Sequence, residues 1–207
     1  MNAWIFTGGT PELSLITERP APNDLCIAAD VGLTHARTLG VPVSLIVGDF
    51  DSLGHVPEVD GAEVITLPAE KDVTDTQCAI SQALERGAES ITLVGGLGGR
   101  LDHTLSNLAL LEQLDEEGVR AVVLDGNHRV RLLHNDRLLL ANSDQFHYLS
   151  LLCISDTARG VCIDGVKYPL KNATLERRHQ FAISNEIVGR GCLISVRRGK
   201  LLVVESR

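Results

Sequence analysis

The sequence predicts an α/β N-terminal domain with a mainly parallel sheet, followed by an all-β C-terminal sandwich. Up to residue 128, short apolar runs rich in valine and isoleucine alternate with segments of helical spacing. Such runs are typical of strands that are buried on both faces of a parallel sheet. From residue 129 onwards, short strand-like runs are separated by turn residues, and no long helical pattern follows. We therefore expect two domains, 1–128 and 129–207.

Candidate strands and helices alternate in the first domain. The apolar runs predict strands at 3–8, 25–30, 44–49, 63–67, 90–95 and 120–125. One helix is predicted within 74–87, where Thr74 and Gln77 have the spacing of a capping box. A second helix is predicted within 101–118, where leucines recur at helical spacing. Because such alternation forms right-handed crossovers, the strands should be mainly parallel.

The second domain is predicted from short strands with turn residues between them. These strands are expected at 129–133, 148–154, 160–164, 165–170, 191–197 and 200–206. Asp164–Gly165 is a strong hairpin signal, and Arg198–Gly199 indicates a further turn. The residues alone favour a small sandwich or a small barrel.

Composition restricts the class of protein and its compartment. The chain has 207 residues, 44% of them hydrophobic, but no window long and apolar enough for a membrane span. A net charge of −8 argues against a nucleic-acid partner, which requires a basic face. The start of the chain has no signal-peptide pattern, and the five cysteines form no CxxC pair. These features predict a cytoplasmic protein with reduced thiols.

Aspartates gather where predicted strands end. Asp30 ends the second strand, Asp49 and Asp51 come with the end of the third, and Asp72 and Asp75 precede a helix. Ligands of open α/β sheets bind outside the carboxyl ends of the strands. Carboxylates placed together there repel one another unless a cation such as Mg²⁺ binds between them. The sequence therefore predicts a magnesium site at this edge.

Each aspartate alone has a simpler explanation. Asp75 can interact with a helix dipole, and Asp30 can cap the next helix. A lone D-x-D pair is weak support for a metal site. Their combination at the strand ends favours the site over these separate explanations.

The segment "GGLGGRLDH", residues 95–103, predicts a phosphate-binding loop between a strand and a helix. Its glycines let the backbone approach a ligand, and Arg100 can contact phosphate oxygens bidentately. Leu101 stands where a dinucleotide-binding motif has its third glycine, and no P-loop lysine follows. The turn "FTGGT" at 6–10 either faces the same crevice or simply ends its strand.

The ordered series "AADVG", "GDFDS", "KDVTD" and "GGLGGRLDH" resembles the thiamine pyrophosphokinase (thiamine diphosphokinase) family. The C-terminal "GVKYPLKNATL" and "ISNE" are also similar to that family, so the resemblance spans nearly the whole chain. It implies transfer of the diphosphate of ATP to the hydroxyl of thiamine, with release of AMP and use of Mg²⁺. It also implies an ATP- and Mg²⁺-binding first domain, a thiamine-binding second domain, and a homodimer with composite active sites.

The resemblance implies roles for individual residues. Asp49, Asp51 and Asp75 would hold Mg²⁺, and Asp30 would lie beside the metal and the thiamine. ATP contacts would come from Lys71, Asp72, Gly98, Gly99, Arg100, Asp102 and His103. Tyr168 would stack on the thiamine, with Ser184 and Asn185 beside it. Asp30, Asp49 and Asp75 remain alternatives as acceptor of the hydroxyl proton.

One position departs from the family pattern. Val31 stands where the family usually has the first glycine of Ala-Asp-Gly-Gly. Valine resists a positive φ, so either φ is negative at Val31 or the turn has shifted.

Two other functions fit parts of the sequence. The "IVGDFDS" segment superficially resembles haloacid-dehalogenase-like phosphatases, but Leu53 stands where that pattern expects Thr or Val. A nucleotide-sensing module that binds ATP without turnover is the other alternative, and the acidic cluster argues against it.

Overall fold

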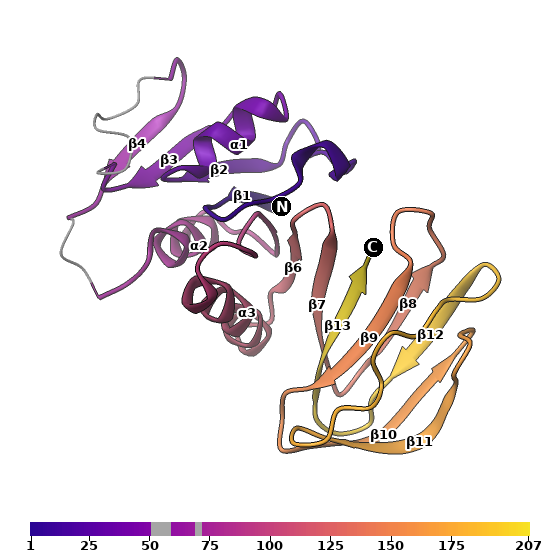
Figure 1. Cartoon of the computed structure of the whole chain (residues 1–207). Helices are drawn as coiled ribbons and strands as arrows, with labels where there is room; N and C mark the ends of the chain where they lie inside the picture. Colours follow the sequence, from indigo (N-terminus) through magenta and orange to yellow (C-terminus); the bar gives the residue numbers. More distant parts are fainter. Residues whose placement is uncertain (51–58, 69–71) are drawn as a thin grey trace. The chain divides into compact units, whose positions relative to one another are not determined.

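The computed structural model describes residues 1–50, 59–68 and 72–207, and it divides into two compact units, Met1–Gly126 and Asn127–Arg207 (Figure 1). Asp51 and Lys71, two of the predicted site residues, lie outside the described residues.

The first unit is built on a parallel sheet. Its strands run in the order β4-β3-β2-β1-β5-β6, and each neighbouring pair is parallel. The strands are β1 (Asn2–Phe6), β2 (Leu25–Ala29), β3 (Leu45–Gly48), β4 (Glu63–Thr66), β5 (Ser90–Val94) and β6 (Arg120–Leu124). Every strand predicted for this part is confirmed.

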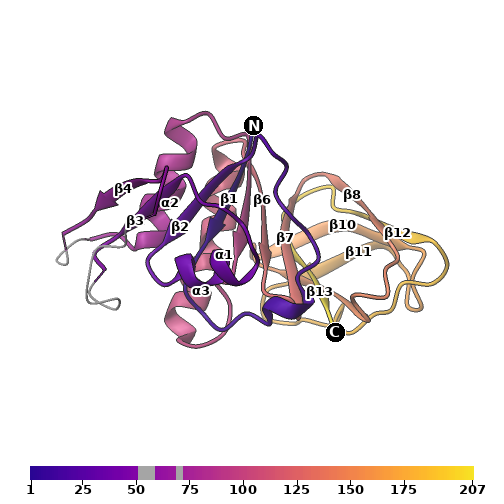
Figure 2. The same cartoon turned by 90° about the horizontal axis from the view of Figure 1, so that it is seen from above.

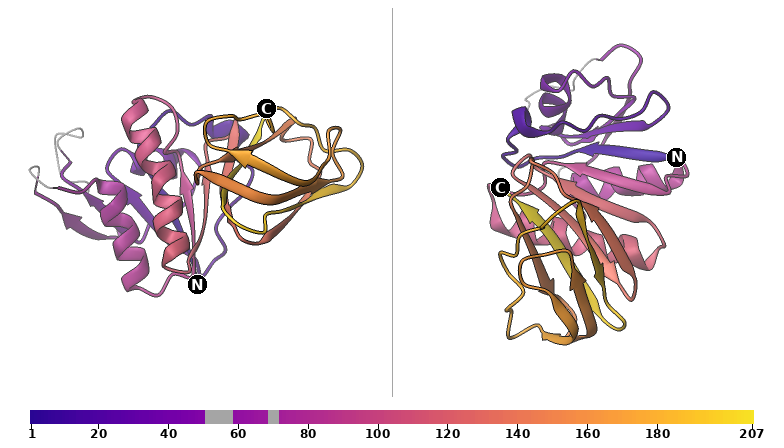
Figure 3. Two further views of the ribbon diagram at one scale, coloured as in Figure 1. Left: turned by 90° about the horizontal axis from the view of Figure 1, so that it is seen from below. Right: turned by 90° about the vertical axis from the view of Figure 1, so that its right-hand side faces the viewer.

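Helices cover both faces of this sheet (Figure 1). Trp4 and Phe6 of β1 pack with Leu33 of α1 (Gly32–Thr38), whereas the alternate residues of the strand point to the other face. On that other face α2 (Asp75–Glu85) and α3 (Leu101–Glu116) lie side by side (Figure 3). The predicted capping box of α2 is present. The helix anticipated after Asp30 is α1, but its N-cap is Val31 and not Asp30, and the sequence predicted no bounds for it. The 3₁₀ turn η1 (Leu13–Leu15) was not predicted.

The second unit is an antiparallel sandwich, which confirms the predicted fold class (Figure 2). One sheet has the order β7-β13-β9, and the other has the order β11-β10-β12-β8. The strands are β7 (His128–His134), β8 (Arg137–Ala141), β9 (Tyr148–Cys153), β10 (Thr157–Asp164), β11 (Leu170–Glu176), β12 (Gly191–Ser195) and β13 (Lys200–Ser206). Leu133 and Leu151 of the first sheet belong to the same buried core as Ile163 and Ile194 of the second.

The strand predicted at 165–170 is wrong in its position. The chain does reverse after Asp164, but β11 begins only at Leu170. Gly165 has a φ of +80°, which is outside the extended region, and Pro169 has no N–H to donate to a neighbouring strand. The strand β8 was not predicted.

Among the described residues, the longest helix is α3 with 16 residues, and no helix has the length and apolar character needed to span a membrane.

Gly32 is expected to be essential for the first unit. A Cβ added there would lie 1.9 Å from the backbone oxygen of Phe6, which no side-chain movement can relieve. Gly32→Ala should therefore lower the free energy of unfolding by about 3 kcal/mol or more, at the upper end of overpacking effects. Gly8→Ala is the matched control, since a Cβ at Gly8 meets nothing within 4 Å. Urea unfolding of both variants measures the effect, and equal stabilities would contradict the expectation.

Candidate active site

Asp30 and Asp49 lie next to each other at the carboxyl edge of the first sheet. Asp30 directly follows β2, Asp49 directly follows β3, and these two strands are parallel neighbours. The backbone N–H of Asp30 donates to the oxygen of Val47 at 2.9 Å. A Cβ built on Gly48 would lie 3.3 Å from the Cα of Asp30. The structure therefore brings these two predicted site residues together.

The backbone around Asp30 answers the question raised by Val31. The φ of Val31 is −53°, within the helical region, and the positive φ of +47° falls on Asp30 instead. Aspartate tolerates this conformation better than valine does. The turn positions the Asp30 side chain so that its Oδ1 atom is completely buried.

Asp49 is held by strained backbone that follows it. Phe50 has a φ of +58°, and only 2% of its surface is exposed. Its ring packs under the preceding turn, where a Cβ on Gly48 would come within 3.1 Å of it. A bulky residue in this region of φ and ψ costs about 1–3 kcal/mol and often marks a functional site. The buried ring thus fixes the position of the aspartate before it.

The start of α2 supplies two further predicted residues. Asp75 is the first residue of the helix and is half-buried, whereas Asp72 is exposed. Thr74 caps the helix by accepting from the N–H of Gln77 at 3.2 Å, while Gln77 accepts from the N–H of Thr74 at 2.8 Å. A carboxylate at this position also interacts favourably with the helix dipole.

The structure also brings the two glycine turns into contact. The N–H of Gly96 donates to the oxygen of Gly8 at 2.9 Å. A Cβ on Gly9 would lie 2.7 Å from the oxygen of Leu97, and a Cβ on Gly95 would lie 2.8 Å from that of Gly8. Only glycine permits backbones to pack this closely. The turn at 6–10 therefore faces the predicted phosphate-binding loop and does more than end β1.

Two helix side chains that the sequence interpretation missed hold these turns. Nδ1 of His35 lies 2.8 Å from the oxygen of Thr7, so this nitrogen carries the hydrogen and donates it. Burial lowers the pKa of His35, which favours the neutral ring. Nδ2 of the buried Asn107 donates to the oxygen of Gly96 at 2.9 Å. Asn107 could have been noticed in the sequence, because it is a polar residue on the face of the predicted helix that is buried.

Arg100 and Asp102 form an exposed ion pair at the start of α3. Nη2 of Arg100 lies 2.6 Å from Oδ2 of Asp102, and Nε lies 3.2 Å from Oδ1. This contact lowers the pKa of Asp102 and raises that of Arg100. Oδ1 of Asp102 also accepts from the N–H of His103 at 3.0 Å. Gly98 and Gly99, the neighbouring loop residues, are exposed and have positive φ.

The predicted thiamine residues lie on adjoining segments of the second unit. Tyr168 is 61% exposed, whereas Asn185 is buried. The Asn185 amide accepts from the N–H of Tyr168 at 3.0 Å and donates to its oxygen at 2.8 Å. Ser184 is exposed, with a φ of +57°. Asn185 therefore fixes the backbone of Tyr168, while the tyrosine ring faces solvent.

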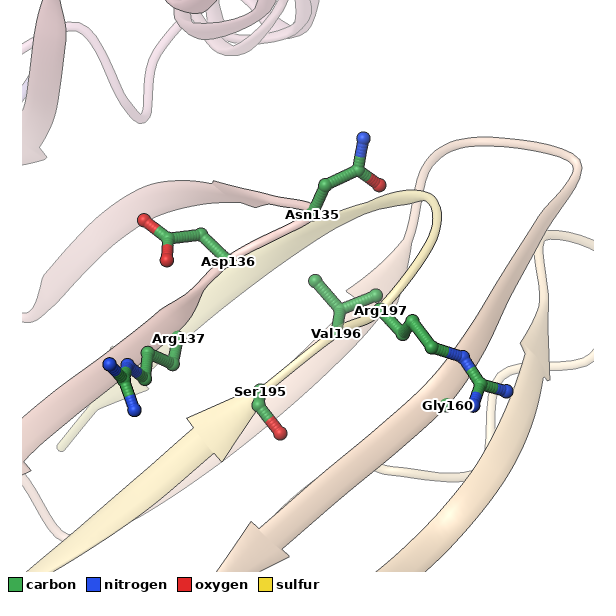
Figure 4. A pocket seen from close by; sticks show the side chains of 7 residues that line it. All are labelled: Asn135, Asp136, Arg137, Gly160, Ser195, Val196 and Arg197. Carbon is green, nitrogen blue, oxygen red and sulfur yellow. The ribbon is translucent and has the colours of Figure 1, made fainter.

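A depression of about 290 Å³ in the second unit contains none of the predicted residues. Arg137, Ser195 and Arg197 are among the residues that line it (Figure 4). The guanidinium groups of Arg137 and Arg197 point in opposite directions in this view, so they do not converge on a common ligand.

Within residues 1–50, 59–68 and 72–207, no three His, Cys, Asp or Glu side chains are grouped as metal ligands. The predicted ligand Asp51 lies outside these ranges, so the three-aspartate metal site stays a prediction.

Comparison with known families agrees with this arrangement. Residues 20–123 match the model of the thiamin pyrophosphokinase catalytic domain, and residues 137–201 match that of its vitamin B1 binding domain. The chain belongs to the thiamin pyrophosphokinase family. The protein is thus an enzyme of a family whose known reaction converts thiamine to thiamine diphosphate at the expense of ATP.

Thiamine pyrophosphokinases from several organisms are similar to this chain. The enzyme of Bacillus subtilis is 26% identical over 95% of this chain and 92% of its own length. Thiamin pyrophosphokinase 1 of Caenorhabditis elegans is 30% identical over 69% of this chain and 62% of its own. The solved structure of the Bacillus subtilis thiamine pyrophosphokinase superposes with a TM-score of 0.87 at 25% identity, covering 100% of this chain and 99% of that one.

Asn107 offers a test of how the glycine turns of this family member are held. Asn107→Asp removes the donor to the Gly96 oxygen and should cost about 1–3 kcal/mol of stability at neutral pH. Burial raises the pKa of the introduced carboxyl, so its protonated form can donate to Gly96 again. The deficit should therefore shrink as the pH falls through that raised pKa towards the ordinary value of about 3.9.

Asn23→Asp is the control, since it makes the same amide-to-acid change at an exposed position. Urea unfolding at several pH values measures both variants. A deficit for Asn107→Asp that does not depend on pH would contradict the proposed donor role.

Proposed function

We propose that this protein carries out the family reaction as a cytoplasmic, Mg²⁺-dependent homodimer, transferring the diphosphate of ATP to the hydroxyl of thiamine and releasing AMP. The observation that carries the proposal is the meeting of strand-end aspartates and two glycine turns at one edge of a parallel sheet. Carboxylates with closely packed backbone amides suit a metal-bound polyphosphate.

The metal would be held by Asp49, Asp51 and Asp75, with Asp30 beside it. Carboxylate oxygens are ligands that Mg²⁺ commonly takes in proteins, and Asp30 and Asp49 follow neighbouring parallel strands at the same edge of the sheet. When bound at these aspartates, the metal would supply positive charge that stabilises the negative charge developing on the phosphate groups. Asp30, Asp49 or Asp75 would accept the proton of the thiamine hydroxyl.

The triphosphate would lie against the glycine turns. Its oxygens would accept hydrogen bonds from the backbone amides of the exposed Gly98 and Gly99 and from the guanidinium of Arg100. Phosphate oxygens would compete with Asp102 for Arg100, because the ion pair between these two side chains is exposed. The proposed ATP contacts also include Lys71, Asp72, Asp102 and His103.

Thiamine would bind on the second unit against Tyr168. Its cationic thiazolium ring suits the face of an aromatic side chain. Ser184 would border the same wall, and Asn185 would hold the Tyr168 backbone in place.

Product identification tests the proposed reaction. Incubation with ATP, Mg²⁺ and thiamine should give AMP and thiamine diphosphate in equal amounts, with no thiamine monophosphate intermediate. Chromatography with mass detection measures the products. ADP in stoichiometric amount would indicate a simple kinase, and free phosphate released without thiamine would indicate a phosphatase.

Subunit exchange tests the proposed composite active sites. Asp49→Asn should be nearly inactive through a weakened metal site, and Tyr168→Ala should be poor at low thiamine. If each site combines Asp49 of one subunit with Tyr168 of the other, every mixed dimer carries one intact site. A mixture should then exceed the summed activity of the two parents at low thiamine.

Mass spectrometry of the mixed dimer establishes that exchange has occurred. Asp60→Asn is the matched control for the charge removed, because Asp60 is exposed and lies shortly before β4, away from the strand end that carries Asp49. Complete exchange without recovery of activity would place both residues in the same subunit's site, or remove Tyr168 from it.

A further inference from the structure

Tyr168 is carried by a rigid backbone ladder at the surface of the second unit. The N–H of Lys167 donates to the oxygen of Glu186 at 2.9 Å, and the N–H of Val188 donates to that of Gly165 at 2.8 Å. The Asn185 amide bonds both backbone groups of Tyr168. The side chains of Lys167 and Tyr168 are exposed, but the backbone that positions them is fixed by these hydrogen bonds.

A cation already lies on the exposed face of the Tyr168 ring. Nζ of Lys167 is 5.6 Å from the ring centroid, within the range of a cation–π contact. The same Nζ lies 2.8 Å from Oε1 of Glu186. Tyr168 and Glu186 together therefore form a slot for a positive charge, made of an aromatic face and a carboxylate.

The surroundings of this slot keep the pair charged. The contact with Glu186 raises the pKa of Lys167, and Tyr168 and Tyr148 raise it further. The same contact with Lys167 lowers the pKa of Glu186. His147 also lowers the pKa of Glu186, and its ring lies edge-on to Tyr148 at 4.6 Å. Both partners are solvent-exposed, with 49% of the Lys167 side chain and 34% of the Glu186 side chain accessible. Such a pair is weak enough for a ligand cation to replace one member.

We propose that thiamine displaces Lys167 from this slot, so that Glu186 becomes the counter-ion of the thiazolium ring and Lys167 acts as a resident competitor. The inference rests on the proposed function and deepens it. It assigns thiamine specificity to two residues beyond Tyr168: Glu186 favours a charged ring over an uncharged one of the same shape, and Lys167 weakens the binding of either.

The test compares thiamine with an uncharged analogue in which carbon replaces the thiazolium nitrogen. Lys167→Met should lower the KM for thiamine by about three- to tenfold, as expected for removal of one nearby exposed charge, and leave kcat unchanged. Adding Glu186→Gln to that variant should raise the KM for thiamine by a similar factor. The inhibition constant of the uncharged analogue should not change between the single and the double variant.

The double variant separates this proposal from a simpler one. If Glu186 serves only to tether Lys167, its substitution has no effect once Lys167 is gone, and the proposal is overturned. Lys171→Met and Glu176→Gln are matched controls, since both residues are exposed on β11 and lie outside the slot. Calorimetric titration of thiamine gives the same comparison without turnover, and Glu186→Ala replaces Glu186→Gln if the latter does not fold.

Failure of the proposed function gives a different result. A wild-type protein that forms no thiamine diphosphate refutes the reaction itself. A wild-type protein that forms it, with the same KM for thiamine in Lys167→Met and in the double variant, refutes only the slot.

Discussion

Close backbone packing at the carboxyl edge of the first sheet is the constraint on which the candidate site depends. The start of α1 lies against the end of β1, so that a Cβ on Gly32 would come within 1.9 Å of the Phe6 oxygen. The turns after β1 and β5 meet in the same way at Gly9 and Gly95. Without side chains between them, three loops converge on one place and leave their amides close together. A larger residue at any of these contacts would separate the loops before it changed any chemistry.

Much of the fold is encoded in local sequence. The strands of the first unit are predictable because each is a short apolar run that ends at a turn residue, and α2 because Thr74 and Gln77 mark its start. The bounds of the helix α1 were not predicted because it has only seven residues and no side-chain cap at Val31. The run at 165–170 looks like a strand, but Gly165 and Pro169 keep most of it out of the sheet.

Some residues of the candidate site were also predictable from the sequence, and others were not. Aspartates at strand ends were predictable, since a parallel sheet brings the carboxyl ends of its strands to one edge. His35 and Asn107 were not, because each bonds a backbone oxygen in a loop far along the chain, 28 and 11 residues away. A backbone oxygen is present at every position, so no residue type in the sequence marks the acceptor. Only the fold decides which loop each side chain reaches.

Three adjacent residues of the second unit, Ser184, Asn185 and Glu186, have separate physical tasks at the surface proposed to bind thiamine. Ser184 turns the chain with a φ of +57°. Asn185 uses both ends of its amide on the backbone of Tyr168, which an ionised carboxylate could not do because it has no donor. Glu186 places a negative charge beside the Tyr168 ring, where Lys167 already shows that a cation fits. The tyrosine ring alone would hold any flat ligand. Since Asn185 fixes the backbone of Tyr168 and Glu186 supplies the charge, the proposed thiamine surface would select for a flat ligand that is also positive.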